Sequence, residues 1–396
     1  LNGAGPGSAS ILLQQASIES NGGNIRFYGQ DDAAGGRAVG GVAPNGDGFF
    51  ANGIQIGNSL VSTCARGVAS CSGGGTISLR GQGATGSLES TTVQGGVGVA
   101  VYGSTLRSGS GAITLDGRGG LGASGVRTVE FGQAGERSVI ESGTGDIRIT
   151  GTTRGWGAGD PVVGFGSEDG DGSADFLGGG SGVSLINTRV TTGGGIMLDG
   201  TGADLTALAG NTGFQGLLIG AASGNSGSVG ASGGVLINST DITAGPGRQV
   251  SVSGKAGGNG FTVSILPSEA TEVQLDTEAA SGVQVAGVFG QGRIRTEGGR
   301  IGILGRDGSD VRLSYFDDSE GGPMTLLSVA SGTGRGGSID IAGRNILLAN
   351  DFEEPTANFL DASGGAGAGS ISLRGRGSIA INGNAGMGAG ATRRRG

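Results

Sequence analysis

A short strand-like motif recurs along the whole chain. Each copy reads Ile-x-Leu-x-Gly or a close variant, so that apolar and other residues alternate and a glycine follows. Alternation over a few residues, bounded by glycine, predicts a half-buried β-strand. The nine copies begin at Ile25, Ile77, Ile113, Ile147, Ile196, Val250, Ile301, Ile339 and Ile371.

A second pattern precedes most copies of this motif. It has two apolar residues separated by one position, a small residue three positions later, and a further apolar residue two positions after that. Its last apolar residue commonly lies about seven positions before the next motif, as Ile18 does before Ile25. The pattern is clearest at residues 11–18, 54–61, 99–106, 183–190 and 235–242.

The two patterns together give three short strands per repeat. Stacked coils of this kind form a parallel β-helix, because no coil buries its apolar face until its neighbours cover it. The sequence therefore predicts an all-β solenoid of about nine coils, with some of the 95 glycines at the corners. We expect an internal row of hydroxyl groups at one corner, made by Ser59, Ser104, Thr188 and Thr240.

Successive motifs are 32 to 54 residues apart, which is more than a bare coil needs. The excess falls mainly after the Ile-x-Leu-x-Gly strand, so we expect long loops at one corner of the solenoid, and insertions of this kind often form a binding face. No break in composition divides the chain. We expect residues 1–396 to be a single solenoid segment of a longer exported chain. The expected loops cover residues 30–52, 152–181, 202–233 and 306–322.

Three stretches resemble a known family. They are Ser338-Ile339-Asp340-Ile341-Ala342-Gly343 with its flanks, Leu360 to Leu373, and Ser378-Ile379-Ala380-Ile381-Asn382-Gly383. Their style is similar to that of secreted exoproteins of the filamentous-haemagglutinin-like, two-partner-secretion type. The resemblance implies a right-handed parallel β-helix, a location outside the cell or on a bacterial surface, and an outer-membrane secretion partner. The family's secretion-domain motif has only a weak counterpart, Ala43-Pro44-Asn45-Gly46, so that domain is not seen.

Charge and composition exclude several classes of function. The net charge is −8 and no basic stripe is present, which argues against a nucleic-acid partner. The chain has no histidine, so Ser-His-Asp, Cys-His and histidine-ligated zinc chemistry are excluded. No run of about twenty apolar residues is present, so we expect no membrane span.

The two cysteines, Cys64 and Cys71, lie close together in the sequence. In an exported chain this spacing predicts one disulfide that closes a short loop, and two free thiols are the alternative. A metal site at this pair would lack further cysteine or histidine ligands.

An acidic segment suggests a weak calcium site. Asp169, Asp171, Ser173 and Asp175 have the alternating oxygen donors of a calcium loop, but Gly180 stands where an EF-hand has its bidentate glutamate. A solvated loop is the alternative, and no other cofactor is indicated.

Aromatic residues in the expected loops are candidate contact residues. They could bind a glycan or a protein receptor, or pack the loops against the solenoid. They are Phe49, Phe50, Trp156, Tyr315 and Phe316.

These observations favour a secreted, non-enzymatic rod that mediates adhesion through its inserted loops, with a glycan or protein on a host cell or another surface as ligand. The alternative is a structural subunit of an extracellular fibre or sheath, in which copies associate end to end. A minor alternative is a polysaccharide-active enzyme, since Asp116 and Asp199 follow motif leucines. A glycosidase, however, needs two carboxyl groups facing each other in a cleft.

Overall fold

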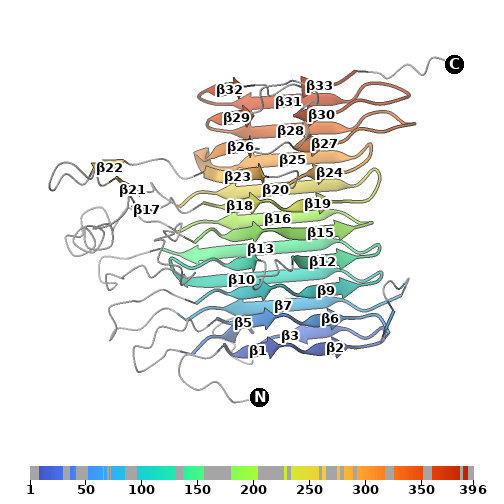
Figure 1. Cartoon of the computed structure of the whole chain (residues 1–396), viewed down its shortest axis with the longest axis vertical. Coiled ribbons are helices and arrows are strands. Elements are labelled where there is room, and N and C mark those ends of the chain that lie inside the picture. The colour runs from blue at the N-terminus through green and yellow to red at the C-terminus, as the bar shows by residue number, and fades with distance from the viewer. Residues whose placement is uncertain are drawn as a thin grey trace.

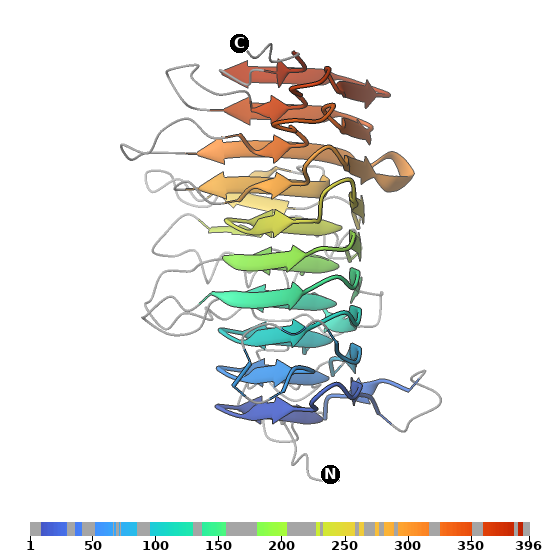
Figure 2. The same ribbon diagram turned by 90° about the vertical axis from the view of Figure 1, so that its right-hand side faces the viewer.

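The computed structural model of the chain is a parallel β-helix (Figure 1). Three parallel sheets run along the rod, and successive coils stack in chain order, with the two termini at opposite ends (Figures 1 and 2). The structure describes residues 9–29, 36–41, 52–65, 67–68, 71, 73–84, 96–129, 137–155, 180–203, 227–229, 233–257, 261–264, 274–276, 281–288, 292–316, 325–350, 359–383 and 387–390.

Sheet C is built from the Ile-x-Leu-x-Gly motifs. Each of the nine copies forms one of its strands, and the motif isoleucines pair from coil to coil, as Ile113 does with Ile77 and Ile147. Its strands are β3 (Ile25–Phe27), β7 (Ile77–Gln82), β10 (Ile113–Leu121), β13 (Ile147–Arg154), β16 (Ile196–Thr201), β20 (Gln249–Lys255), β25 (Arg300–Gly305), β28 (Ser338–Gly343) and β31 (Ser370–Gly375), with β4 (Ala38–Val39) beside β7.

The second pattern forms the other two sheets. Sheet A consists of β1 (Ile11–Gln14), β5 (Ile54–Gly57), β8 (Val99–Tyr102), β11 (Val126–Val129), β14 (Val183–Ile186), β18 (Val235–Asn238), β23 (Ser281–Val288), β26 (Asp310–Phe316), β29 (Ile346–Asn350) and β32 (Ile379–Gly383). Sheet B consists of β2 (Ser17–Glu19), β6 (Leu60–Ser62), β9 (Thr105–Ser108), β12 (Ser138–Ser142), β15 (Thr188–Thr192), β19 (Asp241–Thr243), β24 (Ile294–Arg295), β27 (Leu327–Ser328), β30 (Leu360–Asp361) and β33 (Met387–Gly388). The solenoid therefore has about ten coils, one more than the motif count.

The core is a continuous stack of aliphatic side chains. In a middle coil, Ile147 and Ile149 of sheet C, Val183 and Leu185 of sheet A and Val190 of sheet B are all fully buried. The alternate residues of these strands point outward, as the two-residue period of a strand requires. The core is thin because each strand contributes only one or two inward side chains per coil.

The glycine of the motif has a steric cause. Gly81, Gly117, Gly151, Gly200 and Gly254 end the inward row of sheet C, and there the backbone leading into sheet A packs directly against them. A Cβ at any of these positions would overlap the carbonyl oxygen of the residue before a sheet A valine. The close approach of the two backbones therefore requires glycine at that corner.

The expected row of hydroxyl groups is confirmed at the corner between sheets A and B. The Ser104 hydroxyl accepts a hydrogen bond from the Ser59 amide of the preceding coil at 3.0 Å and donates to Tyr102 O at 2.7 Å. The Thr240 hydroxyl does the same for the Thr188 amide, at 3.1 Å, and for Asn238 O, at 2.9 Å. Each buried hydroxyl thus satisfies backbone groups of its own coil and of the coil before it.

The long connections are not confined to the corner after sheet C. Residues 130–136, 317–324 and 351–358 connect sheet A strands to sheet B strands, so a second corner also carries insertions. The expectation of a loop over residues 306–322 is wrong in its first part: after a single 3₁₀ turn (η2, Arg306–Gly308) the chain enters strand β26. The strand was overlooked because its small residue is not followed closely by the next apolar position, so the second pattern is broken.

A small antiparallel sheet accompanies the rod. It consists of β17 (Gly227–Val229), β21 (Phe261–Ser264) and β22 (Gln274–Asp276), and it lies beside the coils in Figure 1. Its strands come from two different connections between sheet C and sheet A, so insertions of neighbouring coils associate with each other.

Candidate functional site

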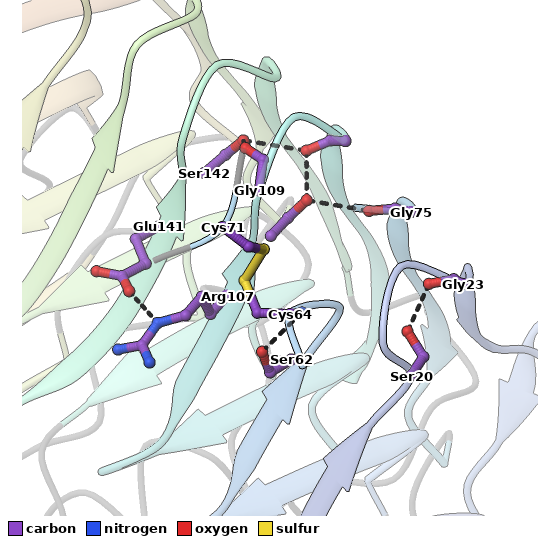
Figure 3. The surroundings of a disulfide bond; sticks show 12 residues. Ser20, Gly23, Ser62, Cys64, Cys71, Gly75, Arg107, Gly109, Glu141 and Ser142 are labelled. Atoms are coloured by element: carbon purple, nitrogen blue, oxygen red, sulfur yellow. Dashed lines mark hydrogen bonds and ion pairs between the residues drawn. A yellow bond between two sulfur atoms is a disulfide. The ribbon is translucent and has the colours of Figure 1, made fainter. Parts of the chain in front are cut away.

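Cys64 and Cys71 are joined by a disulfide in the connection from β6 to β7 (Figure 3). Their Cα atoms are 5.6 Å apart, and Cys64 is buried. Beside the bond, Arg107 of β9 and Glu141 of β12 form an ion pair between adjacent coils. The disulfide closes a short loop at the corner between sheets B and C and crosses no other element.

Most of the other predicted site residues lie outside the described residues. These are the calcium candidates Asp169, Asp171, Ser173 and Asp175 and the contact candidates Phe49, Phe50 and Trp156. Within the part of the chain that the structure describes, no group of three or more His, Cys, Asp or Glu side chains could hold a metal ion.

Tyr315 is not a contact residue on a loop. It belongs to β26, and its side chain is only 1% exposed because it points inward and joins the core. Phe316 is the last residue of the same strand, so its backbone is part of sheet A. The prediction for Tyr315 was wrong because the broken pattern around β26 made a strand look like a loop.

The acidic residues considered for catalysis are held in ion pairs. Asp116 contacts both Arg37 and Arg80, and Asp199 lies 2.8 Å from Arg306. Through Thr150 the register places the two aspartates in one outward row of sheet C, two coils apart. They thus lie in one row on the outward side of sheet C, each beside arginine, and do not face each other across a cleft.

Sheet B carries a basic patch that the sequence analysis missed. We call Arg189, Arg293 and Arg295 the arginine patch; all three side chains are exposed on the outward face. The register pairs Arg189 with Asp241 of the next coil and Thr243 with Arg295 of the coil after that. Arg293 directly precedes β24, which contains Ile294 and Arg295. The three arginines therefore lie within three successive coils.

The only carboxylate among these outward positions is already neutralised. Asp241 Oδ2 lies 3.1 Å from Arg137 Nη1, and its Oδ1 accepts hydrogen bonds from the amides of Gly292 and Arg293 at 3.2 and 3.3 Å. Among the described residues, no carboxylate forms an ion pair with Arg189, Arg293 or Arg295. The Asp241 carboxylate thus has its own arginine partner, Arg137, so it does not pair with the three arginines of the patch.

The patch is hollowed at one end. A shallow depression of about 230 Å³ is lined by Arg293, Ile294, Arg295, Thr325 and Ser328. Arg295 Nε donates a hydrogen bond to the Thr243 hydroxyl at 3.1 Å, so one arginine of the rim is held in place by the preceding coil. Two arginines and two hydroxyl-bearing residues therefore line an open hollow in the sheet face.

A sequence signal for the patch exists in retrospect. The three arginines flank Val190 and Ile294, the inward residues of sheet B that end the second pattern. Residues next to these apolar positions fall on the outward face of one sheet, but they line up only when the coils are aligned across insertions of very different length.

No helix among the described residues has the length and apolar character that crossing a membrane would require. Comparison of the chain with protein families, curated proteins and solved structures gives no match in any of the three.

Proposed function

We propose that the chain is a secreted, extracellular or surface-exposed rod that mediates adhesion through its inserted loops without catalysing a reaction. One observation carries this proposal. The motif strands keep the same register from coil to coil while the connections between them vary widely in length. A scaffold that tolerates such insertions can display many different segments along one rigid axis, and several weak contacts then add by multivalency.

The disulfide supports the extracellular location. Structural disulfides persist in oxidising compartments and are rare in the cytosol of most organisms. The bond between Cys64 and Cys71 is therefore consistent with a protein that works outside the cell. Export through an outer-membrane secretion partner, as the resemblance implies, belongs to the same proposal.

Loop replacement tests the adhesive role. Residues 156–179, between β13 and β14, contain the single tryptophan and the densest acidic segment, and a short Gly-Ser linker should replace them without loss of folding. Shortening a loop changes the free-energy cost of closing it by only about 1 kcal/mol, so the coils should keep their stability. We expect binding to cells or immobilised glycans to fall at least about tenfold, a change of about 1.4 kcal/mol.

The matched control replaces residues 85–95, between β7 and β8, which leave the rod at the same corner and contain no aromatic residue. This variant should bind like the parent chain. If every single-loop replacement leaves binding intact, the loops do not carry adhesion and the proposal fails.

A second candidate function, a subunit of an extracellular fibre, is favoured by the last coil. Ile379 and Ile381 of β32 occupy the inward register of Ile346 and Leu348, yet they are 45% and 46% exposed. Among the described residues no further strand continues the sheets beyond β31, β32 and β33, and these edges could pair with β3, β1 and β2 of a second copy, because unpaired strand edges are templates for association.

A further inference from the structure

The arginine patch on sheet B is a charged surface that the proposed adhesive loops do not explain. Its three guanidinium groups are exposed and form no ion pair with a carboxylate among the described residues, although the whole chain carries a net charge of −8. Clustering like charges on one face costs free energy unless an opposite charge is bound. The patch is therefore a local reversal of the charge of the molecule, and it points to an anionic partner.

The chemistry of the patch selects oxyanions. An arginine side chain presents planar N–H donors that match two oxygens of a carboxylate, sulfate or phosphate at once. Thr325 and Ser328 add hydroxyl groups at the hollow beside Arg293 and Arg295. Ile294 contributes only to the floor because its side chain is fully buried.

The spacing of the patch favours a polymer over a single ion. Arg189 and Arg293 lie on either side of Asp241 in one outward row, so they are two coils apart. At about 4.8 Å per coil this separation is about 10 Å. The three arginines thus extend over two coil spacings along sheet B, and a chain with charged groups along its length can contact all of them at once.

The surroundings favour a polysaccharide over other polyanions. Among the described residues of the patch no aromatic side chain is available to stack on nucleic-acid bases, which is the usual platform for single strands. The patch also lacks the exposed apolar side chains that insert into a lipid surface. Hydroxyl groups, from Thr191, Thr243, Thr325 and Ser328, are instead the main neighbours of the arginines.

We propose that Arg189, Arg293 and Arg295 form a binding site on the rod itself for an acidic polysaccharide, whose carboxylate or sulfate groups bind along the axis of sheet B. This site is independent of the inserted loops and of the adhesive role proposed for them. Asp317, Asp318 and Glu320 precede Thr325 in the sequence and lie outside the described residues, so the test uses the whole chain.

The test compares two triple variants with the same change in charge. The first is Arg189→Gln, Arg293→Gln and Arg295→Gln; the second removes exposed arginines from sheets C and A by Arg26→Gln, Arg148→Gln and Arg312→Gln. Glutamine keeps a polar side chain at these exposed positions, and circular dichroism checks that both variants fold. Binding is measured by titration with polygalacturonate and dextran sulfate, with neutral dextran as the blank.

We expect the patch variant to bind at least one of the two polymers at least about tenfold more weakly than the parent chain, and the control variant to stay within about twofold. Equal losses in both variants would mean unspecific attraction, and a parent chain that binds neither polymer would also overturn the proposal. Inorganic sulfate that binds as tightly as the polymer would show a small-ion site instead. Binding of single-stranded DNA or anionic vesicles with the same dependence on the patch would overturn the choice of a polysaccharide.

Discussion

At the scale of single residues, the coils are held together by polar side chains as well as by the apolar core. A buried hydroxyl at the corner between sheets A and B accepts a hydrogen bond from a backbone amide of the preceding coil and donates to a carbonyl of its own. Removing one partner of a buried hydrogen bond leaves the other unsatisfied, which costs more than the bond itself contributes. These hydroxyls are therefore expected to stabilise the stacking of adjacent coils.

Replacing Thr240 by valine tests this role. The change keeps the shape of the side chain but leaves the Thr188 amide, within a fully buried corner, without its acceptor. We expect the coils around β15 and β19 to lose about 1–3 kcal/mol of stability against local opening. Hydrogen exchange of the amides in these strands measures the loss. Thr191→Val, on the half-exposed outward face of β15, is the control and should change protection little.

Asp310 should make the stability of strands β26 and β29 depend on pH. Its carboxylate accepts hydrogen bonds from Nε and Nη2 of Arg344 at 2.8 and 3.0 Å and from the Asn345 amide at 3.0 Å, so it joins β26 to the chain that enters β29. Partial burial raises the pKa of Asp310, but the hydrogen bonds from Arg344 and Asn345 outweigh this effect, and the pKa lies below its ordinary value. A depressed carboxyl pKa stabilises the fold above the unfolded-state value of about 3.9, and that stability is lost as the pH falls through the folded-state value.

Hydrogen exchange measures the free energy of opening of β26 and β29. We expect this free energy to fall between pH 5 and pH 3 in the parent chain by about 1 kcal/mol more than it falls in Asp310→Asn. Asp340→Asn removes a carboxylate whose partner among the described residues is the half-exposed Arg300, and it should leave the pH dependence of these two strands unchanged. Parent and Asp310→Asn chains with the same pH profile would show that Asp310 does not couple the coils.

At the scale of the element, the motif of sheet C is a packing requirement as well as a strand signal. A Cβ at Gly200 would overlap the carbonyl oxygen of Gly234 and lie 2.8 Å from Cγ2 of Val235. The glycine thus allows the entry to sheet A to pack against the end of a sheet C strand. The same relation recurs at several coils, which explains why glycine ends the motif so regularly.

Two glycine-to-alanine changes in sheet C separate this steric overlap from the effect of alanine on strand propensity. Gly200→Ala should destabilise the rod by about 1–3 kcal/mol, because the neighbouring backbone must move. Gly302→Ala, on the outward face of β25 with nothing within 4 Å of the added atom, should be neutral or stabilise the strand by about 0.5 kcal/mol. Thermal unfolding of both variants measures the difference, and equal effects would mean that the close approach does not determine the motif.

The same elements show how far the sequence could predict the structure. Sheet C was predictable strand by strand, because its apolar alternation and its glycine lie within six residues and no insertion interrupts them. Sheets A and B were predictable only where the small residue at their shared corner follows the apolar pair at the fixed distance of the second pattern. Strands β11 and β26 could not be predicted in this way, because residues 130–136 and 317–324 separate them from the sheet B strands that follow in the sequence.

The arginine patch could not be predicted at all from local pattern. Arg189 and Arg293 are more than one hundred residues apart, and only the register of sheet B brings them into one row. The disulfide, by contrast, required no knowledge of the register, because Cys64 and Cys71 are only seven positions apart.

At the scale of the whole molecule, the first and last described coils both leave apolar residues of the core incompletely covered. Ile379, Ile381 and Met387 continue the inward rows of the core at one end, and each is close to half-exposed. The corresponding rows begin at the other end with Ile11, Leu13 and Ile18, which are only partly buried. Stacking one rod on another would extend every row in register, at the normal strand spacing, and would bury these side chains.

The double variant Ile379→Arg and Ile381→Arg decides between fibre subunit and separate rod. It places charge on the exposed end of the core, whereas Leu304→Arg places charge on an equally exposed apolar residue in the outward face of β25. If copies associate end to end, electron microscopy and sedimentation velocity will show filaments for the parent chain and for Leu304→Arg, but single rods for the double variant. Filaments that persist in the double variant would show that association uses another surface. Single rods in all three chains would leave display along an isolated rod as the function, with the loops and the arginine patch as its contact surfaces.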